Sequence, residues 1–233
     1  MLVKAIKTRI FKEGEDLLGF IVANIPSIEE RSIIFVTSKI VALAERRVVL
    51  KTSERTKIKL IKQESQWAMK TKYTWLTIKD NKVLACAGID ESNAAGKLIL
   101  LPRDSFKTAA QLRKKLQLFY KVRHLGIVIT DSRLLPLRAG TVGVALGYAG
   151  FIGRKDYENT FDLFGRKFEH QRTDVADSLA TAAVLTMGEG KERCPLAIVT
   201  KAPIKFSSRI NRRELDINPA DDIYRPLFQH LRR

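Results

Sequence analysis

The chain has 233 residues, and its 42 Lys and Arg residues against 25 Asp and Glu residues give a formal net charge of +17. Its hydrophobic fraction of 45% is large enough to bury a core, which excludes a chain that is disordered throughout. Its two cysteines, Cys86 and Cys194, have no second Cys or His at a ligand spacing, which excludes a disulfide framework and a zinc module.

The apolar stretches are too short to cross a bilayer, which takes about 20 consecutive apolar residues. The longest, such as residues 17–25, is interrupted by glycine and by a polar residue, and residues 1–12 lack the features of a signal peptide. We therefore expect a soluble cytoplasmic protein with no membrane partner. The positive charge favours anionic partners, but no nucleic-acid-binding motif accompanies it, so nucleic acid is not the favoured partner. A cluster of basic residues between Arg46 and Lys62 has no function that the sequence indicates.

Apolar runs typical of strands alternate with helical stretches along the chain. Strands are expected at residues 32–36, 83–86, 97–101, 126–130, 141–148 and 196–200. A helix capped by Asp104 or Ser105 is expected to run to about Tyr120, and a second one to begin at Thr173 and stop at Gly188. These elements predict an α+β or mixed α/β fold. We expect one domain over residues 1–200, with a charged C-terminal extension over residues 201–233 that packs on it and contains a short helix near residues 223–231.

Glycine-rich phosphate loops of the common kinds are missing, because the sequence has neither GxxxxGK[ST] nor GxGxxG. Four glycines, Gly140, Gly143, Gly147 and Gly150, instead lie three and four residues apart in and around a run typical of a strand. This pattern favours a strand that another part of the backbone approaches closely, and the alternative is a loop that faces a phosphate.

Two acidic segments follow predicted strands. Asp90 lies in a polar loop, residues 87–96, whose carboxylate and hydroxyl oxygens suit a hard cation such as Mg²⁺. The alternative, which spacing alone favours, is an Asx turn that satisfies its own backbone. Asp131 directly follows the apolar run 126–130, and the carboxyl end of a buried strand is where open α/β sheets hold ligand groups. The alternative for Asp131 is a turn or a helix cap.

Three further aspartates have weaker contexts. Asp162 is a third candidate site residue, but its place before Gly165 is equally typical of a turn. Asp174 and Asp177 are most simply interpreted as acids that complement the N-terminus of the second predicted helix.

Taken in order, several motifs resemble the γ-glutamyl ligase family of coenzyme F420 synthesis. They are VTSKIV with AE at residues 36–41 and 44–45, GIDESN at 88–93, LLPRD at 100–104, VITDS at 128–132, RAG at 138–140, VALG at 144–147, FDLFGR at 161–166, and VADSLA with AA at 175–180 and 182–183. The ordered series extends over most of residues 1–200, and it is far more specific than any one motif.

The resemblance implies an amide ligase that depends on a nucleoside triphosphate, usually GTP, and on Mg²⁺ or Mn²⁺. Such an enzyme joins L-glutamate to a carboxylate of F420-0, a phosphorylated deazaflavin, through an acyl phosphate. The resemblance also implies a mixed α/β fold without a Walker loop, in an intertwined homodimer with sites near the dimer groove.

Carried over by position, the resemblance makes Asp90 and Asp131 the catalytic residues and the metal ligands. Ser132 stands where the family usually has a metal-contacting Thr, and Lys39 and Asn93 would contact the nucleotide. These residue types suit the chemistry, because metal-bound carboxylates offset the charge that develops as a phosphoryl group moves.

The sequence also departs from the family pattern. The usual Asp-Thr-aromatic-Gly-Arg-Pro is here DSRLLP at residues 131–136, and the Arg-Gly that commonly closes the last strand is replaced by TKA at residues 200–202. These changes bear on recognition of the acceptor more than on the metal. A folate γ-glutamyl ligase of the same fold is therefore an alternative, and a non-catalytic protein that binds nucleic acid or other anions is a weaker one. The choice between GTP and ATP and the number of glutamates added stay open.

Overall fold

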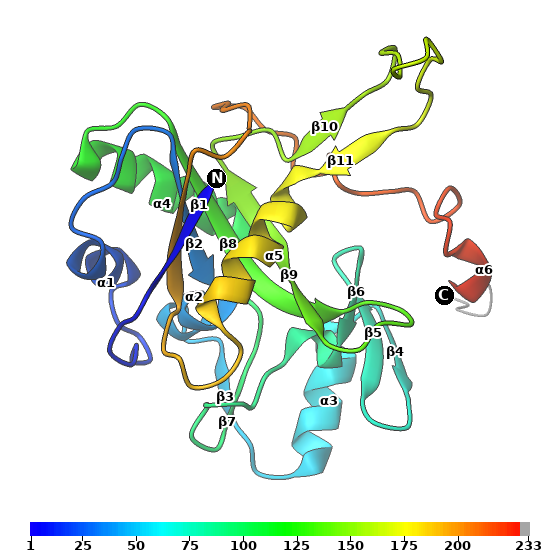
Figure 1. The fold of residues 1–233 in the computed structure, drawn as a ribbon. Coiled ribbons are helices and arrows are strands. Elements are labelled where there is room, and N and C mark those ends of the chain that lie inside the picture. Colours follow the sequence, from blue (N-terminus) through cyan, green and yellow to red (C-terminus); the bar gives the residue numbers. More distant parts are fainter. Residues whose placement is uncertain (229–233) are drawn as a thin grey trace.

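A five-stranded sheet forms the centre of the computed structural model, which describes residues 1–228 (Figure 1). The strand order is β1-β12-β2-β8-β9, in which β2 and β8 are parallel and the other neighbours are antiparallel. The strands are β1 (Leu2–Ile6), β2 (Ser32–Thr37), β8 (Leu125–Leu134), β9 (Thr141–Ala149) and β12 (Leu196–Thr200). The predicted mixed α/β fold is confirmed, as are four of the predicted strands, to within a few residues at their ends.

Helices cover both faces of this sheet. The apolar side chains of β2 alternate between the faces, with Ile34 and Val36 on one side and Ile33 and Phe35 on the other. The first pair packs with α1 (Leu17–Asn24), α2 (Ser38–Ala44) and α4 (Ser105–Tyr120), and the second pair packs with α5 (Val175–Met187). Because β2 is buried on both faces, its sequence is a continuous apolar run and not an alternating one.

Aspartate residues cap the N-termini of the two predicted helices. Asp104 caps α4 by accepting a hydrogen bond from the backbone N–H of Lys107 at 2.9 Å, as expected. The predicted start of α5 at Thr173 is wrong by two residues, because Thr173 belongs to the short strand β11 (Arg172–Asp174), which pairs with β10 (Arg154–Asp156). Asp174 is the cap of α5, and Gly188 ends that helix as predicted.

A β-bulge changes which side chains of β9 face each layer. Ile129 pairs with Gly147 and Thr130 pairs with Ala145, which leaves Leu146 as the extra residue. An extra residue shifts the alternation of side chains by one position. Odd-numbered residues of β9 before Leu146 therefore face one layer, and odd-numbered residues after it face the other layer.

Two glycines of β9 use this change to meet a helix on each face. A Cβ at Gly143 would lie 2.4 Å from the carbonyl oxygen of Ala180 in α5, and a Cβ at Gly147 would lie 2.5 Å from the backbone nitrogen of Phe106 in α4. The predicted close approach of another backbone to this strand is thus confirmed.

A smaller layer is built from residues 48–99. It contains β3 (Val48–Leu50), α3 (Glu54–Glu64), β4 (Trp67–Lys70), β5 (Trp75–Lys79), β6 (Lys82–Ala85), a single 3₁₀ turn (Cys86–Gly88) and β7 (Lys97–Ile99). Ile61 of α3 packs against Leu98 and Leu100, while most of the helix carries charged residues to its surface. The strands predicted near residues 83 and 97 are confirmed, with ends that differ by one or two residues.

An arm formed by residues 154–174 projects from the sheet, and Figure 1 shows its loop projecting at the top right of the molecule. The turn at its tip is held by Asp162, whose Oδ1 accepts hydrogen bonds from the N–H groups of Phe164 and Arg166, each at 2.8 Å. The interpretation of Asp162 as a turn residue is therefore confirmed. Phe161, Leu163 and Phe164 are 65%, 97% and 95% exposed, so the tip is apolar.

The C-terminal segment is fastened to the main sheet by Glu214. Its carboxylate accepts hydrogen bonds from the Tyr148 hydroxyl at 2.6 Å and from the Gly153 N–H at 2.8 Å, and Arg154 donates to its carbonyl oxygen at 2.9 Å. Of the helix expected near residues 223–231, α6 (Arg225–Phe228) is present, and residues 229–231 lie outside the described part. The division of the chain at residue 200 stays a prediction. No helix within residues 1–228 is long and apolar enough to cross a membrane.

Candidate active site

The parallel pairing of β2 and β8 brings two predicted site residues to one edge of the main sheet. Thr37, the last residue of β2, pairs with Thr130 of β8. Lys39 lies just beyond β2 in the first turn of α2, and Asp131 follows Thr130. The expectation that the strand ends before Asp131 is wrong, as is the alternative of a turn or a helix cap, because β8 continues to Leu134 and Asp131 pairs with Val144 of β9. Carboxyl ends of neighbouring parallel strands are where open α/β sheets bind ligands, so this edge is the natural place for a site.

Asp90 reaches the same place from the smaller layer. Its backbone N–H and carbonyl both bond to Ile99, at 2.9 and 2.8 Å, which fixes the start of the loop. Its carboxylate accepts from the Lys39 ammonium at 2.7 Å and from the N–H and hydroxyl of Ser92 at 2.7 and 3.0 Å. The Asx turn that spacing favoured is present, yet the carboxylate also faces Lys39 across the cleft. Burial opposes ionisation of Asp90, but the bonds from Lys39 and Ser92 outweigh it and lower its pKa.

Asp131 has the opposite electrostatic setting. Burial raises its pKa to about 7, and the negative charges of Asp90 and Glu189 add to this effect, while hydrogen bonds from Ser132 and Ser38 oppose it. The carboxylate is therefore costly to ionise in the protein alone. A divalent cation bound beside it would offset that cost.

These groups line a cleft of about 480 Å³. Its walls come from six separated stretches, which lie within residues 8–11 after β1, 37–43 in α2 and just before it, 88–93 in the acidic loop, 99–101 at the end of β7 and beyond, 130–132 in β8, and 184–195 at the end of α5 and beyond. Sequence analysis singled out site residues in three of them, and it identified the stretch 99–101 only as a strand and a family motif. It missed residues 8–11, which carry no motif that we interpreted, and residues 187–195, whose glycines were interpreted only as a helix stop.

The loop after α5 contacts the other two predicted residues. The Asn93 side-chain amide donates to the Gly190 carbonyl at 3.4 Å, and the Ser132 hydroxyl donates to the Glu189 carboxylate at 3.3 Å. All five residues that the sequence singled out, Lys39, Asp90, Asn93, Asp131 and Ser132, thus line one cleft.

The oxygen atoms in this cleft suit a hard cation that is shared with a bound phosphate. Asp90, Asp131 and Ser132 supply carboxylate and hydroxyl groups, and the buried hydroxyl of Thr130, which also lines the cleft, has no hydrogen-bond partner among residues 1–228. Within residues 1–228, no three Asp, Glu, His or Cys side chains converge closely enough to hold a metal ion by themselves. Mg²⁺ commonly takes only one or two protein carboxylates and completes its shell with water and phosphate oxygens. The residues present fit that mode of binding.

Part of the basic cluster between Arg46 and Lys62 supports the acidic loop. Lys51 and Lys57 bind the two carboxylate oxygens of Glu91, the neighbour of Asp90, at 2.7 and 2.8 Å. These two hydrogen bonds, with that from Lys51 the stronger, lower the pKa of Glu91 to about 2. The cluster therefore has a structural role that its sequence alone did not indicate.

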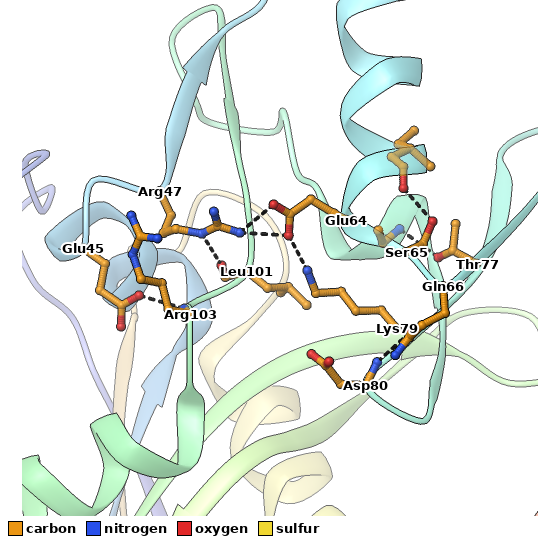
Figure 2. A network of polar contacts seen from close by, with 12 residues as sticks. Glu45, Arg47, Glu64, Ser65, Gln66, Thr77, Lys79, Asp80, Leu101 and Arg103 are labelled. Carbon is orange, nitrogen blue, oxygen red and sulfur yellow. Dashed lines mark hydrogen bonds and ion pairs between the residues drawn. The ribbon is translucent and has the colours of Figure 1, made fainter.

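Arg47, from the same cluster, belongs to the network in Figure 2. Its guanidinium donates to the carbonyl of Leu101 at 3.1 Å and to the carboxylate of Glu64 at 2.8 Å, and Lys79 pairs with the same carboxylate. The network joins α3 and β5 to the segment after β7. It thereby fixes the backbone of Leu101 in the wall of the cleft.

The acids at the start of α5 serve the fold. Asp174 accepts the N–H of Asp177 at 2.9 Å, which confirms its interpretation as a helix-terminal acid. Asp177 also lies in the first turn, but its carboxylate accepts from the Ala145 N–H at 2.9 Å and pairs with Arg133 at 3.2 Å. It therefore ties α5 to β9 and β8, a role that the sequence did not reveal.

Comparison with known proteins shows the family to which the chain belongs. The model of the F420-0:gamma-glutamyl ligase family matches residues 5–201, so the chain belongs to that family. Among similar curated proteins is a coenzyme F420:L-glutamate ligase of Methanothermobacter thermautotrophicus, 34% identical over 201 residues that cover 82% of this chain and 78% of that protein. Proteins of the same name from Archaeoglobus fulgidus and Methanococcus maripaludis strain C7 are 32% and 28% identical, covering 82% and 97% of this chain and 83% and 97% of their own lengths. The resemblance found from the motifs is confirmed.

Proposed function

We propose that the protein is a ligase that joins L-glutamate to a carboxylate of F420-0, using a nucleoside triphosphate and Mg²⁺ or Mn²⁺. The observation that supports this most is the meeting of Asp90, Asp131 and Lys39 in one cleft, where β2 ends beside β8. The names of the relatives point to the same substrates.

The reaction needs an activated carboxylate, because a free carboxylate is a poor electrophile. We propose that the terminal phosphoryl group of the nucleotide moves to the acceptor carboxylate, which gives an acyl phosphate and a nucleoside diphosphate. The glutamate amine, after loss of a proton, then attacks the carbonyl carbon, and inorganic phosphate leaves as the amide bond forms. Catalysis of such a transfer is largely positioning and electrostatic stabilisation of phosphate charge.

The side chains divide this work. Asp90, Asp131 and Ser132 would hold the divalent cation, which supplies positive charge to the phosphate oxygens. The Lys39 ammonium has three N–H donors, and in this structure it meets the Asp90 carboxylate and the carbonyl and hydroxyl of Ser92, at 2.7, 3.0 and 3.2 Å. We propose that Lys39 exchanges its contact with Asp90 for a phosphate oxygen when the nucleotide binds. Asn93, on the same loop as Asp90, would also contact the nucleotide.

The test is an assay with purified full-length protein, L-glutamate, Mg²⁺ or Mn²⁺, and either GTP or ATP. F420-0 and tetrahydrofolate are offered in separate reactions, and products are identified by mass. We expect F420-0 to gain a glutamyl residue only when nucleotide and metal are both present. A glutamylated folate with no glutamylated F420-0 would show that the acceptor is a folate and not F420-0. No product from either acceptor would contradict the ligase proposal.

We also propose that two copies of the chain form a homodimer through the arm. Its tip presents Phe161, Leu163 and Phe164 to solvent at the end of a projecting hairpin. An exposed apolar cluster of this kind typically marks an interaction surface. The family resemblance implies a homodimer, so we propose that a second copy of the chain covers this apolar tip.

This dimer predicts a clear effect of charge at the tip. Changing Leu163→Asp together with Phe164→Asp should convert the protein from a dimer to a monomer, because carboxylates resist burial in an apolar contact. The mass in solution is measured by light scattering coupled to size-exclusion chromatography. A control with Tyr73→Asp and Leu118→Asp, two exposed residues outside the arm, should stay dimeric. A wild-type protein that is monomeric at micromolar concentration, or a tip variant that stays dimeric, would contradict the proposed dimer.

A further inference from the structure

A second cavity, of about 930 Å³, lies beside the candidate active site. Leu101 lines both spaces, and the Arg47 guanidinium donates a hydrogen bond to its carbonyl oxygen at 3.1 Å. This second space, here called the basic cavity, is formed by the turn between β5 and β6, the start of α4, and the C-terminal segment 212–218.

The C-terminal segment crosses the basic cavity and is attached on both sides. On one side the Arg212 guanidinium bonds to Asp104, the cap of α4, at 2.5 Å. On the other side the Asn81 side-chain amide donates to the Ile217 carbonyl at 3.5 Å. The wall that this segment provides lies outside residues 5–201, which the family model matches.

The lining suits a flat aromatic group. Leu84, Leu101 and Leu146 form an apolar cluster at the cavity, and Phe106 lies at its side. The guanidinium of Arg212 lies over the Phe106 ring, 5.1 Å from its centre. A planar ligand would find both apolar contacts and a stacking partner there.

The charge of the lining suits an anion. Five Lys and Arg residues line the cavity against three Asp residues, and one of those acids, Asp104, is already bonded to Arg212 and to the Lys107 N–H. Within the described residues, the guanidinium groups of Arg103 and Arg213 have neither an ion pair nor a side-chain hydrogen bond, and both residues are exposed to the cavity or solvent. They are free to bind an acidic ligand.

We propose that the basic cavity binds the ring end of the acceptor, an acidic molecule with a planar aromatic system, while the carboxylate of the acceptor reaches Asp131 past Leu101. This proposal rests on the proposed function. It makes Arg103 and Arg213 determinants of acceptor specificity, and it gives the C-terminal segment a part in substrate binding.

The test compares two double variants that change the net charge equally. Arg103→Glu with Arg213→Glu reverses the two free cations of the cavity, and Arg55→Glu with Lys59→Glu reverses two exposed cations on α3 that line neither cavity. Binding of F420-0 to each full-length protein is measured by calorimetry without nucleotide, and binding of GTP with Mn²⁺ is measured separately. Glutamyl transfer is followed by mass for each protein.

We expect the cavity variant to bind F420-0 at least tenfold more weakly than the wild type, to bind GTP and Mn²⁺ normally, and to show a raised KM for the acceptor. The α3 variant should behave as the wild type. Equal loss in both variants would show a general effect of charge and would overturn the proposal, as would normal F420-0 binding by the cavity variant. A wild type that binds F420-0 through these arginines but forms no product would leave the cavity assignment standing and contradict the ligase proposal. A wild type that binds no F420-0 would overturn the cavity proposal.

Discussion

The substitution Asp131→Asn should abolish glutamyl transfer while leaving the protein at least as stable as the wild type. Loss of one group that stabilises developing charge typically costs roughly 10²–10³-fold in turnover, and loss of a metal ligand should cost at least as much. Stability should not fall, because the Asp131 carboxylate is costly to ionise in a space that also holds Asp90 and Glu189. An amide of the same shape has no charge to bury. Transfer is measured by product mass, and stability by the thermal midpoint without metal.

A second readout separates a metal ligand from a residue that merely shapes the cleft. Addition of Mn²⁺ with GTP should raise the thermal midpoint of the wild type, because a ligand that binds only the folded state stabilises it. It should raise the midpoint of Asp131→Asn and of Asp90→Asn much less. Asp222→Asn, a change in the C-terminal segment outside both cavities, is the matched control and should respond as the wild type. Near-normal turnover in either cleft variant would contradict the assignment of these residues.

The largest expected effect on folding comes from Gly147→Ala. A Cβ there would lie 2.5 Å from the backbone nitrogen of Phe106 and 2.5 Å from the carbonyl carbon of Ser105. Neither atom has the freedom of a side chain, so α4 and β9 would have to separate. Overpacking of this kind costs about 1–3 kcal/mol and occasionally more, and we expect about 3 kcal/mol here because the obstacle is backbone. The urea midpoint of unfolding measures it.

Gly190→Ala is the matched control for this prediction. A Cβ at Gly190 meets only the side chain of Glu192, at 3.3 Å, and the glycine does not have a positive φ. A flexible side chain can move aside, so the free energy of unfolding should change by no more than about 0.5 kcal/mol. Equal urea midpoints for Gly147→Ala and Gly190→Ala would contradict this prediction, because α4 and β9 would then have separated without a loss of stability.

The central strands of the main sheet could be predicted because burial on both faces leaves a continuous apolar run in the sequence, whereas the edge strand β1, which has no fully buried residue, was missed. Residues 32–36, 126–130 and 196–200 are runs of this kind, and each is a strand of the sheet. Helix α3 was missed because it lacks a buried apolar face. Ile61 is its one buried residue, and its charged residues are typical of a basic surface. The short strands β3, β10 and β11 were missed because three residues are too few for an alternation to be recognised.

The candidate site could be predicted only in part, because its residues come together through topology. The motifs identified Asp90 and Asp131, but nothing in their spacing showed that a parallel pairing of β2 with β8 would bring Lys39 and Asp131 to one edge. Nor did it show that the loop of the smaller layer would place Asp90 against Lys39. Glu189 had no signal other than its place between two glycines. Its contact with Ser132 arises because α5 ends above the edge of the sheet where β8 enters the cleft.

The charge of +17 now has three distinguishable parts. Lys51 and Lys57 are occupied by Glu91, and Arg47 is occupied by Glu64 and Leu101, so these cations maintain the fold. A few others line the two cavities, where anionic substrates are expected. The rest are spread over a solvated surface.

The cleft draws its walls from six stretches that lie between residue 8 and residue 195. No fragment shorter than residues 8–195 contains them all, so a smaller proteolytic piece or a split half should have no affinity for nucleotide until the parts reassociate. Occupancy of the cleft therefore reports on the integrity of nearly the whole polypeptide. A simple titration of GTP with Mn²⁺ would then measure the fraction of correctly folded molecules in any preparation, including one that has lost its acceptor specificity.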